Sequence, residues 1–106
     1  MSTKDDRAAS ILIHLAADYI AREAGRQTLI TPTRVELEDR KNAIIYVSVF
    51  PDNEREHALE FLNRHKDGFR DYLKKEGRFS ILPYVRFAFD AGEANRQHLD
   101  ELSKDL

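Results

Sequence analysis

The spacing of the apolar residues changes from a helical period to a period of two near residue 28, and returns to a helical period after residue 51. Over residues 5–25 the apolar side chains fall on one helical stripe, and Gly25 is suited to end the helix. The stripe consists of Ala8, Ile11, Leu12, Leu15 and Tyr19, widened by Ile13, Ala17 and Ile20. We therefore predict a long amphipathic helix over residues 5–25.

Two segments of period two follow this helix, as expected for two strands. In the first, the residues predicted to share a face are Leu29, Thr31, Thr33, Val35 and Leu37. In the second, one face is predicted to hold Ala43, Ile45, Val47 and Val49, and the other Ile44, Tyr46, Ser48 and Phe50. The connection EDRKN is short and polar, and we expect Asp39 to form its turn. The two strands are therefore predicted to form an antiparallel hairpin.

A second helical segment runs from about residue 52 to Glu76 and carries a glycine in its interior. Either Asp52 or Asn53 is suited to cap its start, and Gly77 to end it. A glycine inside a helix costs about 1 kcal/mol relative to alanine. We therefore expect Gly68 to mark a break that divides the segment into two helices.

The last apolar segment, RFSILPYVRFAFD, is predicted to be a strand. Its alternation places Phe79, Ile81, Val85, Phe87 and Phe89 inward, and Arg78, Tyr84 and Arg86 outward. Pro83 has no N–H, so it belongs at a sheet edge or a strand break. Because a helical crossover precedes this strand, it should run parallel to the second strand with a right-handed connection.

These elements predict one α+β domain over residues 1–106, with a three-stranded sheet covered by helices on one face. The segment 93–106 is acidic and is expected to be a loose tail with weak helical periodicity. The chain has no cysteine and no apolar run of transmembrane length, which excludes disulfides, thiolate chemistry and a membrane span. A cytoplasmic setting is expected, because no signal-peptide pattern precedes the first helix.

The charge distribution is uneven, although the net charge is only −2. Residues 64–78 hold six basic and three acidic side chains, a local charge of +3. A break at Gly68 would create a helix N-terminus there, and a residue without a side chain lets an RNA backbone approach closely. The predicted RNA-contacting residues are Arg64, Lys66, Gly68, Arg70, Lys74, Lys75 and Arg78. The alternative is that the glycine only lets the helices fit around the core.

Other basic and aromatic residues are weaker candidates for RNA contact. Arg34, Arg40, Lys41 and Arg86 would extend the basic region, but surface solubility explains them better. Tyr46 and Tyr84 have rings that stack on bases in other proteins, but covering the sheet edge is the favoured interpretation.

The order of elements, with a glycine-marked kink between two helices, resembles a type II KH domain, and more closely the KH variant of the ribosome-binding factor A family. In that family an Ala-x-Gly kink replaces the usual GxxG loop. The segments that carry the resemblance are TPTRVELEDRKNAIIYVSV, ALEFLNRHKDGFRDYL and RFSILPYVRFAFD. Lys66 departs from the alanine of the kink, and Ser80 stands where an arginine often precedes the last strand.

The resemblance implies a role in assembling the small ribosomal subunit. Members of the family bind free or immature small subunits and their rRNA, assist late maturation of that rRNA, and support growth in the cold. They are not enzymes. The resemblance therefore implies a monomer that contacts rRNA, with no cofactor, metal, membrane or small-molecule substrate.

Two other classes of function remain open from the residues alone. A protein-interaction module with the same fold and no direct RNA binding agrees with the acidic balance of the chain. A small hydrolase or metalloprotein has less support, because the histidines at 14, 57, 65 and 98 lack metal-ligand spacing such as HExxH. His14, on an apolar helix, is expected to be packed. Walker and GxGxxG motifs are absent from the sequence, so a nucleotide cofactor is not expected.

Overall fold

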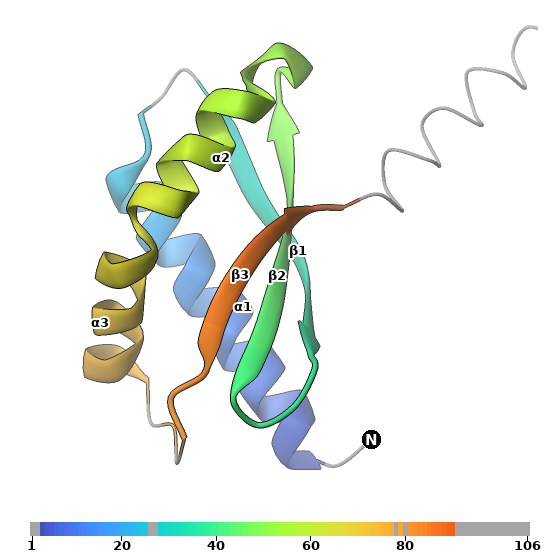
Figure 1. Ribbon diagram of the computed structural model, residues 1–106, viewed down its shortest axis with the longest axis vertical. Coiled ribbons are helices and arrows are strands. Elements are labelled where there is room, and N and C mark those ends of the chain that lie inside the picture. Colours follow the sequence, from blue (N-terminus) through green and yellow to red (C-terminus); the bar gives the residue numbers. More distant parts are fainter. Residues whose placement is uncertain (1–2, 26–27, 78, 80, 91–106) are drawn as a thin grey trace, which may run out of the picture.

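The structure is a computed structural model that describes residues 3–25, 28–77, 79 and 81–90 (Figure 1). Its elements are α1 (Thr3–Glu23), β1 (Leu29–Leu37), β2 (Asn42–Phe50), the 3₁₀ turn η1 (Asp52–Glu54), α2 (Arg55–Arg64), α3 (Lys66–Glu76) and β3 (Tyr84–Phe89). This is the predicted order of an α+β domain with a three-stranded sheet.

The sheet has the strand order β1-β2-β3, with β2 in the centre. Strands β1 and β2 are antiparallel, and β2 and β3 are parallel, as the sequence predicts. On the inward face, Ile45 of β2 lies opposite Val35 of β1 and Phe87 of β3. Because β2 has neighbours on both sides, it is the central strand, and β1 and β3 form the two edges of the sheet.

The predicted alternation along β1 is wrong in its first half. The register shifts between Pro32 and Arg34, so Thr33 is an additional residue in the strand. Before the bulge Ile30 lies on the inward face opposite Val49, and Leu29 lies on the outer face and is exposed. A one-residue bulge exchanges the two faces of a strand, because side chains alternate with a period of two. The prediction for Val35 and Leu37, beyond the bulge, is correct.

All three helices pack on the inward face of the sheet, as predicted (Figure 1). Helix α1 contributes its buried residues at a spacing of four, Leu12, Ala16 and Ile20, whereas Ile11 of the predicted stripe is 39% exposed. The most deeply buried large side chains are Phe69, Leu12, Ile45, Leu62, Leu73 and Val47. Full burial of a large apolar side chain contributes about 1.5–3 kcal/mol, so these side chains hold the helices on the sheet.

The ends of several elements differ from the prediction. Strand β3 begins at Tyr84, directly after Pro83, which cannot donate a ladder hydrogen bond. Ile81 therefore precedes the strand and is 42% exposed, not inward, although Phe79 packs against the core. Helix α2 begins at Arg55 after η1 and has no side-chain cap, so the predicted capping by Asp52 or Asn53 is wrong. Arg78, Ser80 and the segment 93–106 lie outside the described residues.

The turn between β1 and β2 is built by Asp39, as predicted. One oxygen of its carboxylate accepts hydrogen bonds from the backbone N–H groups of Lys41, at 2.7 Å, and Asn42, at 2.8 Å. The hydrogen bond from the Lys41 N–H, followed by those from Asn42, holds the pKa of Asp39 below its usual range. The carboxylate thus satisfies backbone donors of the turn, as Asp side chains commonly do.

Candidate nucleic-acid interface

The break between α2 and α3 lies at His65, three residues before its predicted position at Gly68. His65 has φ −96° and ψ 6°, outside the helical region. Its N–H donates to the Phe61 carbonyl oxygen at 3.1 Å, and the Phe69 N–H donates to the His65 carbonyl oxygen at 2.7 Å. The amides between them belong to the first turn of α3, where a helix leaves its N–H groups without intrahelical partners. The predicted second N-terminus therefore exists, but Gly68 lies inside the helix that it begins.

The break is surrounded by aromatic side chains from all three helices. The His65 ring lies 4.3 Å from the Phe61 ring, and its Nδ1 shares a hydrogen bond with the Tyr19 hydroxyl at 3.1 Å. The Tyr19 ring also lies 5.4 Å from each of the rings of Phe69 and Tyr72. Tyr19 therefore connects α1 to the break and to α3. Burial, followed by the charges of Glu23 and Asp71, raises the pKa of Tyr19, so its hydroxyl keeps its proton.

Sequence reasoning missed the part that Tyr19 and His65 play in this region. The sequence predicts Tyr19 only as one member of an apolar helical stripe, and His65 only as a histidine without ligand spacing. The one available signal was the position of His65, which directly precedes Lys66-Asp67-Gly68. Nothing in the sequence indicates that residue 19 lies against residues 65–72.

The predicted basic residues do not form a single cluster. Lys66, Arg70 and Lys74 recur every four residues and form one stripe along α3, here called the α3 basic stripe. Gly68 lies about 160° around the helix from Arg70, and Lys75 about 140° from it, because successive residues are about 100° apart. Gly68 faces α1, since a Cβ there would lie 2.6 Å from the Tyr19 hydroxyl oxygen. Arg64 ends α2 on the other side of the break.

The α3 basic stripe lies beside the edge strand β3. The guanidinium carbon of Arg70 is 4.4 Å from the centre of the Tyr84 ring, a cation–π contact. Tyr84 itself is 62% exposed at the start of β3, which agrees with its predicted place at a sheet edge. The Arg70 Nε atom is buried and has no hydrogen-bond partner among the described residues. The ring thus fixes the guanidinium without using its N–H donors.

The basic residues around the break carry unneutralised charge. Within the described part of the chain, the five cations on α2 and α3 listed at the end of this paragraph form no ion pair within 4.0 Å. Asp67 and Asp71 lie on the neighbouring stripe of α3, about 100° around the axis from Lys66 and Arg70 respectively. They reduce the positive potential without pairing with any of these cations. The cations are Arg64, Lys66, Arg70, Lys74 and Lys75.

The outer face of the sheet, opposite the helices, is arranged differently. Arg34 lies 3.7 Å over the Tyr46 ring, 3.8 Å from the Glu36 carboxylate and 4.0 Å from that of Asp90. Arg86 donates to Glu38 at 2.8 Å. These two arginines are therefore paired with carboxylates, which favours a role in surface solubility over a role in RNA contact.

Tyr46 does not cover a sheet edge, because it lies on the central strand β2. Its hydroxyl donates to Glu36 at 2.9 Å, and this hydrogen bond is the main reason that the pKa of Tyr46 is raised. Both tyrosine rings have an arginine over one face, but the Tyr46 hydroxyl is bound as well, so Tyr46 has less freedom to stack on a base than Tyr84 has.

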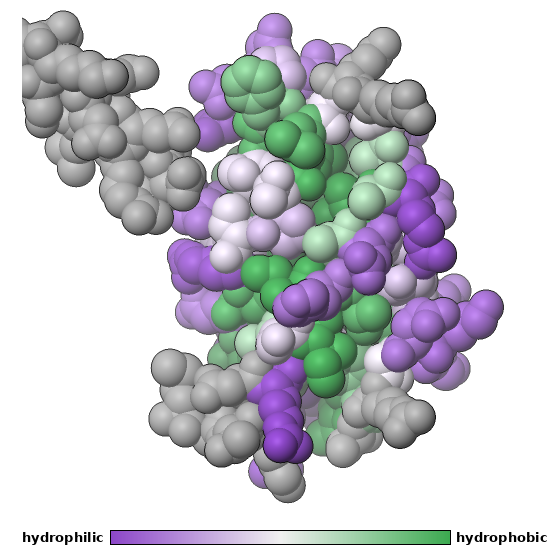
Figure 2. All heavy atoms as spheres, turned by 180° about the vertical axis from the view of Figure 1, so that it is seen from behind, coloured by the Kyte–Doolittle hydropathy of each residue, from purple (hydrophilic) through white to green (hydrophobic). Residues whose placement is uncertain are grey.

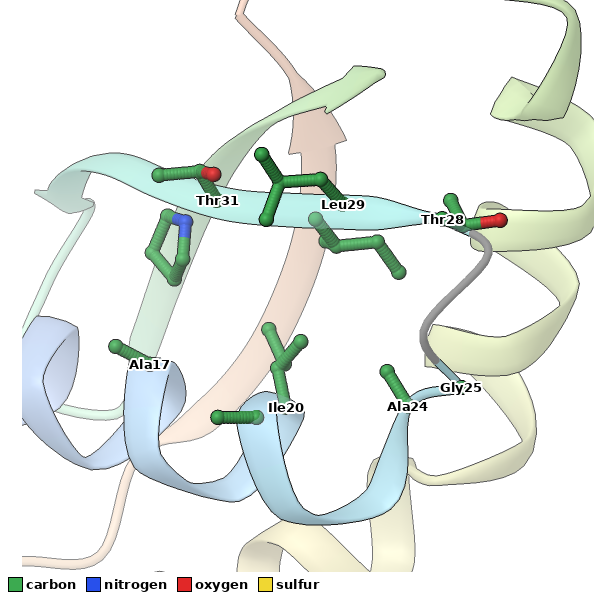
Figure 3. Close-up of a pocket in the computed structure, with 10 residues that line it drawn as sticks. Ala17, Ile20, Ala24, Gly25, Thr28, Leu29 and Thr31 are labelled. Carbon is green, nitrogen blue, oxygen red and sulfur yellow. The ribbon is translucent and has the colours of Figure 1, made fainter. Parts of the chain in front are cut away.

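An apolar groove of about 450 Å³ lies at the opposite edge of the sheet, between α1 and β1 (Figure 3). Ile20 and Ala24 point from α1 toward the strand, which contributes Leu29 and Pro32. No titratable side chain lines the groove among the described residues. The groove therefore offers apolar contact and no acid–base chemistry.

Metal-ligating side chains do not gather in the described part of the chain. The described residues contain no group of three or more His, Cys, Asp or Glu side chains placed to hold a metal ion. The prediction that His14 is packed is wrong, because its side chain is exposed. Its Nδ1 shares a hydrogen bond with the Ser10 carbonyl oxygen at 2.8 Å. In the same part of the chain, each helix is too short or too polar to cross a membrane.

Comparison with known proteins agrees with the fold. The crystal structure of ribosome-binding factor A from Thermus thermophilus superimposes with a TM-score of 0.69, covering 78% of this chain and 92% of that one at 24% sequence identity. At that identity the likeness concerns the fold alone.

Sequence comparison identifies the family. Ribosome-binding factor A of Thermodesulfovibrio yellowstonii is 30% identical over 102 residues, which are 95% of this chain and 81% of that protein. The protein of the same name from Thermotoga petrophila is 38% identical over 69 residues, but these span only about half, 53%, of its length. The family model described as "Ribosome-binding factor A" matches residues 4–103. This chain therefore belongs to the ribosome-binding factor A family.

Proposed function

We propose that this chain binds the small ribosomal subunit through its rRNA and assists the late maturation of that rRNA. The observation that carries the proposal is the α3 basic stripe, whose cations have no carboxylate partner among the described residues. The name of the relatives, ribosome-binding factor A, supports a ribosomal partner. The proposed role is that of a cytoplasmic, monomeric, non-enzymatic factor that needs no cofactor.

Arg70 is the central contact in this proposal. Its guanidinium lies on the Tyr84 ring, so little side-chain entropy is lost when it meets a ligand. The fork of N–H donors can hold two phosphate oxygens at once. Lys66 and Lys74, one helical turn away on either side, add point charges along a line of about 12 Å. This arrangement suits an RNA backbone that runs along α3.

The first turn of α3 supplies a second kind of contact. The backbone N–H groups of Lys66, Asp67 and Gly68 have no partner within the helix, and the helix dipole makes this end positive. A phosphate placed there accepts hydrogen bonds from amides as well as from the Lys66 ammonium. The carboxylates of Asp67 and Asp71 oppose this attraction, so we infer that binding is reversible, as an assembly factor requires.

The proposal is tested by sedimenting the purified protein with free small subunits and with intact ribosomes, at low and at raised salt. We expect binding to free small subunits that weakens steeply with salt, because RNA releases counterions when basic residues neutralise its phosphates. Little binding to intact ribosomes is expected. Absence of binding to both particles would contradict the proposal.

We also propose that this chain supports growth in the cold, as the family resemblance implies, and this role and the role in maturation need a cellular test. Expressed in a bacterial strain that lacks its own ribosome-binding factor A, this chain is expected to restore growth at low temperature and to reduce the pool of precursor small-subunit rRNA. If the protein sediments with free small subunits but does not restore rRNA processing in the cell, its function is limited to binding.

A second candidate is a protein-interaction module, which the apolar surface of the molecule favours. Leu29 and Phe50 lie opposite each other on the outer face and are 64% and 71% exposed. Leu29 also lines the groove between α1 and β1, and Figure 2 shows a band of apolar side chains on one face of the molecule. An apolar protein interface would respond weakly to salt, unlike the RNA contact. The sedimentation experiment therefore distinguishes the two functions.

A further inference from the structure

Gly68 lies where an RNA-contacting glycine would be expected, but its missing side chain faces another part of the protein. A Cβ at this position would lie 2.6 Å from the Tyr19 hydroxyl oxygen and 3.7 Å from the ring carbon that bears it. The first separation is well inside van der Waals contact. The hydroxyl of Tyr19 therefore occupies the space that a side chain at residue 68 would need.

The same hydroxyl also holds the residue at which the helix breaks. It shares a 3.1 Å hydrogen bond with Nδ1 of His65, the residue between α2 and α3. The ring below it packs against Phe69 and Tyr72, and Arg22 of α1 lies 4.7 Å over the Tyr72 ring. One side chain of α1 thus contacts the break, the first turn of α3 and the second turn of α3.

The contacts of Tyr19 set where the first turn of α3 lies relative to α1. Lys66 is the first residue of that turn, and Arg70 lies one turn further on, over Tyr84. A displacement of the turn would move both cations together, because α3 is a rigid helix. The contact between Tyr19 and Gly68 is therefore coupled mechanically to the α3 basic stripe, although it lies on the other side of the helix.

We infer that the missing side chain of Gly68 serves to seat the Tyr19 hydroxyl and not to let an RNA backbone approach closely, and that Tyr19 is a positioning residue that holds the α3 basic stripe in its binding geometry. This inference rests on the proposed function, since it names residues that orient the proposed RNA contacts. It differs from a direct RNA contact at Gly68 in one consequence: the effect of a side chain at residue 68 depends on the hydroxyl at residue 19.

The test is a double-mutant cycle of Gly68→Ala and Tyr19→Phe, with Kd for free small subunits measured at one salt concentration. Gly68→Ala is expected to weaken binding about tenfold, within the range of coupling seen for residues in contact. Tyr19→Phe removes the hydroxyl and is expected to weaken binding by less. In the double variant the new methyl group takes the space of the lost hydroxyl, so binding is expected to return to within about threefold of the wild type.

Gly25→Ala is the matched control. Among the described residues, and apart from its chain neighbours, no heavy atom lies within 4 Å of a Cβ at Gly25, so the same substitution there is expected to leave Kd unchanged. Circular dichroism and thermal unfolding of every variant show whether each is folded. If Gly68→Ala alone does not fold, the inference predicts that adding Tyr19→Phe restores folding and binding together.

The outcomes separate this inference from the proposed function. One outcome is that the wild type binds while the fold-increase in Kd of the double variant equals the product of the fold-increases of the two single variants. In that case the RNA contacts Gly68 directly and the inference is wrong. If Gly68→Ala binds like the wild type, the inference is also wrong. If the wild type itself shows no salt-sensitive binding to small subunits, the proposed function fails, and the positioning role fails with it.

Discussion

Two arginines in this molecule lie over tyrosine rings, and their surroundings differ. Arg34 lies 3.7 Å over Tyr46 on the outer face of the sheet, and Arg70 lies 4.4 Å over Tyr84 beside α3. Arg34 has the carboxylates of Glu36 and Asp90 within 4.0 Å, whereas Arg70 has no carboxylate within that distance among the described residues. Both arginines make a cation–π contact, but in the described part of the chain only the charge of Arg34 has carboxylates beside it.

This difference shows where the molecule can attract an anion. An arginine that already faces two carboxylates must lose those contacts before it can bind phosphate, and the carboxylates repel the phosphate as well. An arginine that is oriented by an aromatic ring alone keeps its charge available, and in Arg70 only the buried Nε–H is withdrawn from an incoming anion. The two regions therefore have different functions, although both place cations over aromatic rings on the surface.

The largest expected effect comes from removing three charges on one region or on the other. We predict that the triple variant Lys66→Gln, Arg70→Gln and Lys74→Gln binds free small subunits on the order of 100-fold more weakly, because each lost phosphate contact is a charge-assisted hydrogen bond. The matched control is Arg34→Gln, Arg40→Gln and Arg86→Gln, which removes the same charge from the sheet and its turn. Equal losses for the two triple variants, measured as Kd in one buffer, would remove the distinction between the regions.

The next effect concerns the sheet region, to which we assign a role in stability. The Thr33 hydroxyl donates a 2.6 Å hydrogen bond to the buried carboxylate of Asp90, and its oxygen also lies 3.3 Å from the Tyr46 carbonyl oxygen. Thr33→Val should lower the free energy of unfolding by about 1–3 kcal/mol, because a buried charged acceptor loses the hydrogen bond from this hydroxyl. Thr31→Val, at an exposed position of the same strand, is the control.

Urea denaturation followed by circular dichroism gives both free energies of unfolding. The division of roles also requires that the folded fraction of Thr33→Val binds small subunits as the wild type does. A stable Thr33→Val variant with weakened binding would place the sheet region in the interface and so contradict that division.

A smaller effect sharpens the comparison at the tyrosines. Tyr84→Leu removes the ring that orients Arg70 and is expected to weaken binding about 2- to 5-fold, the equivalent of a cation–π contact of about 0.5–1 kcal/mol. Tyr46→Leu removes the corresponding ring under Arg34 and is expected to leave binding unchanged. If Tyr46→Leu has the larger effect on Kd, base stacking occurs on the sheet and not at its edge.

The smallest effect concerns a histidine that, like Arg34, lies beside a carboxylate. The His57 Nδ1 lies 2.9 Å from the Glu54 carboxylate, and this hydrogen bond, followed by the charge of Glu54, raises the pKa of His57. The pKa is raised on folding, so the associated stability is present below about pH 6.5 and is lost as the pH rises through the folded value. A titration followed by NMR should give a midpoint for His57 above about 6.5. Glu54→Gln should lower that midpoint, and an unchanged midpoint would show that the pair does not form.

The sequence was sufficient to predict the elements, their order and the strand directions, because these depend on local periodicity and on short connections. The bulge at Thr33 could not be predicted in the same way. It is held by a hydrogen bond to Asp90, 57 residues away, which no local pattern contains. Pro32 was the one local warning, since proline in a strand favours an edge or an irregular position.

The candidate site was predictable only as a list of residues. Composition located the basic residues near Gly68, but not which of them share a stripe or which carry carboxylate partners. The break at His65 is held by Tyr19, 46 residues earlier in the chain. Helical spacing alone would have separated Gly68 from Arg70, since residues two apart do not share a helix face. That Arg34 and Arg86 lie beside carboxylates can be seen only in the tertiary structure.

The most direct test of the division between the two regions is the salt dependence of binding by Arg70→Gln and by Arg34→Gln. The slope of log Kobs against log salt reports the number of phosphates that the protein neutralises, at about 0.7–0.9 per phosphate. We predict that Arg70→Gln reduces the slope for free small subunits by about that amount, and that Arg34→Gln leaves it at the wild-type value. A reduced slope for Arg34→Gln with a wild-type slope for Arg70→Gln would assign RNA binding to the outer face of the sheet and contradict the account.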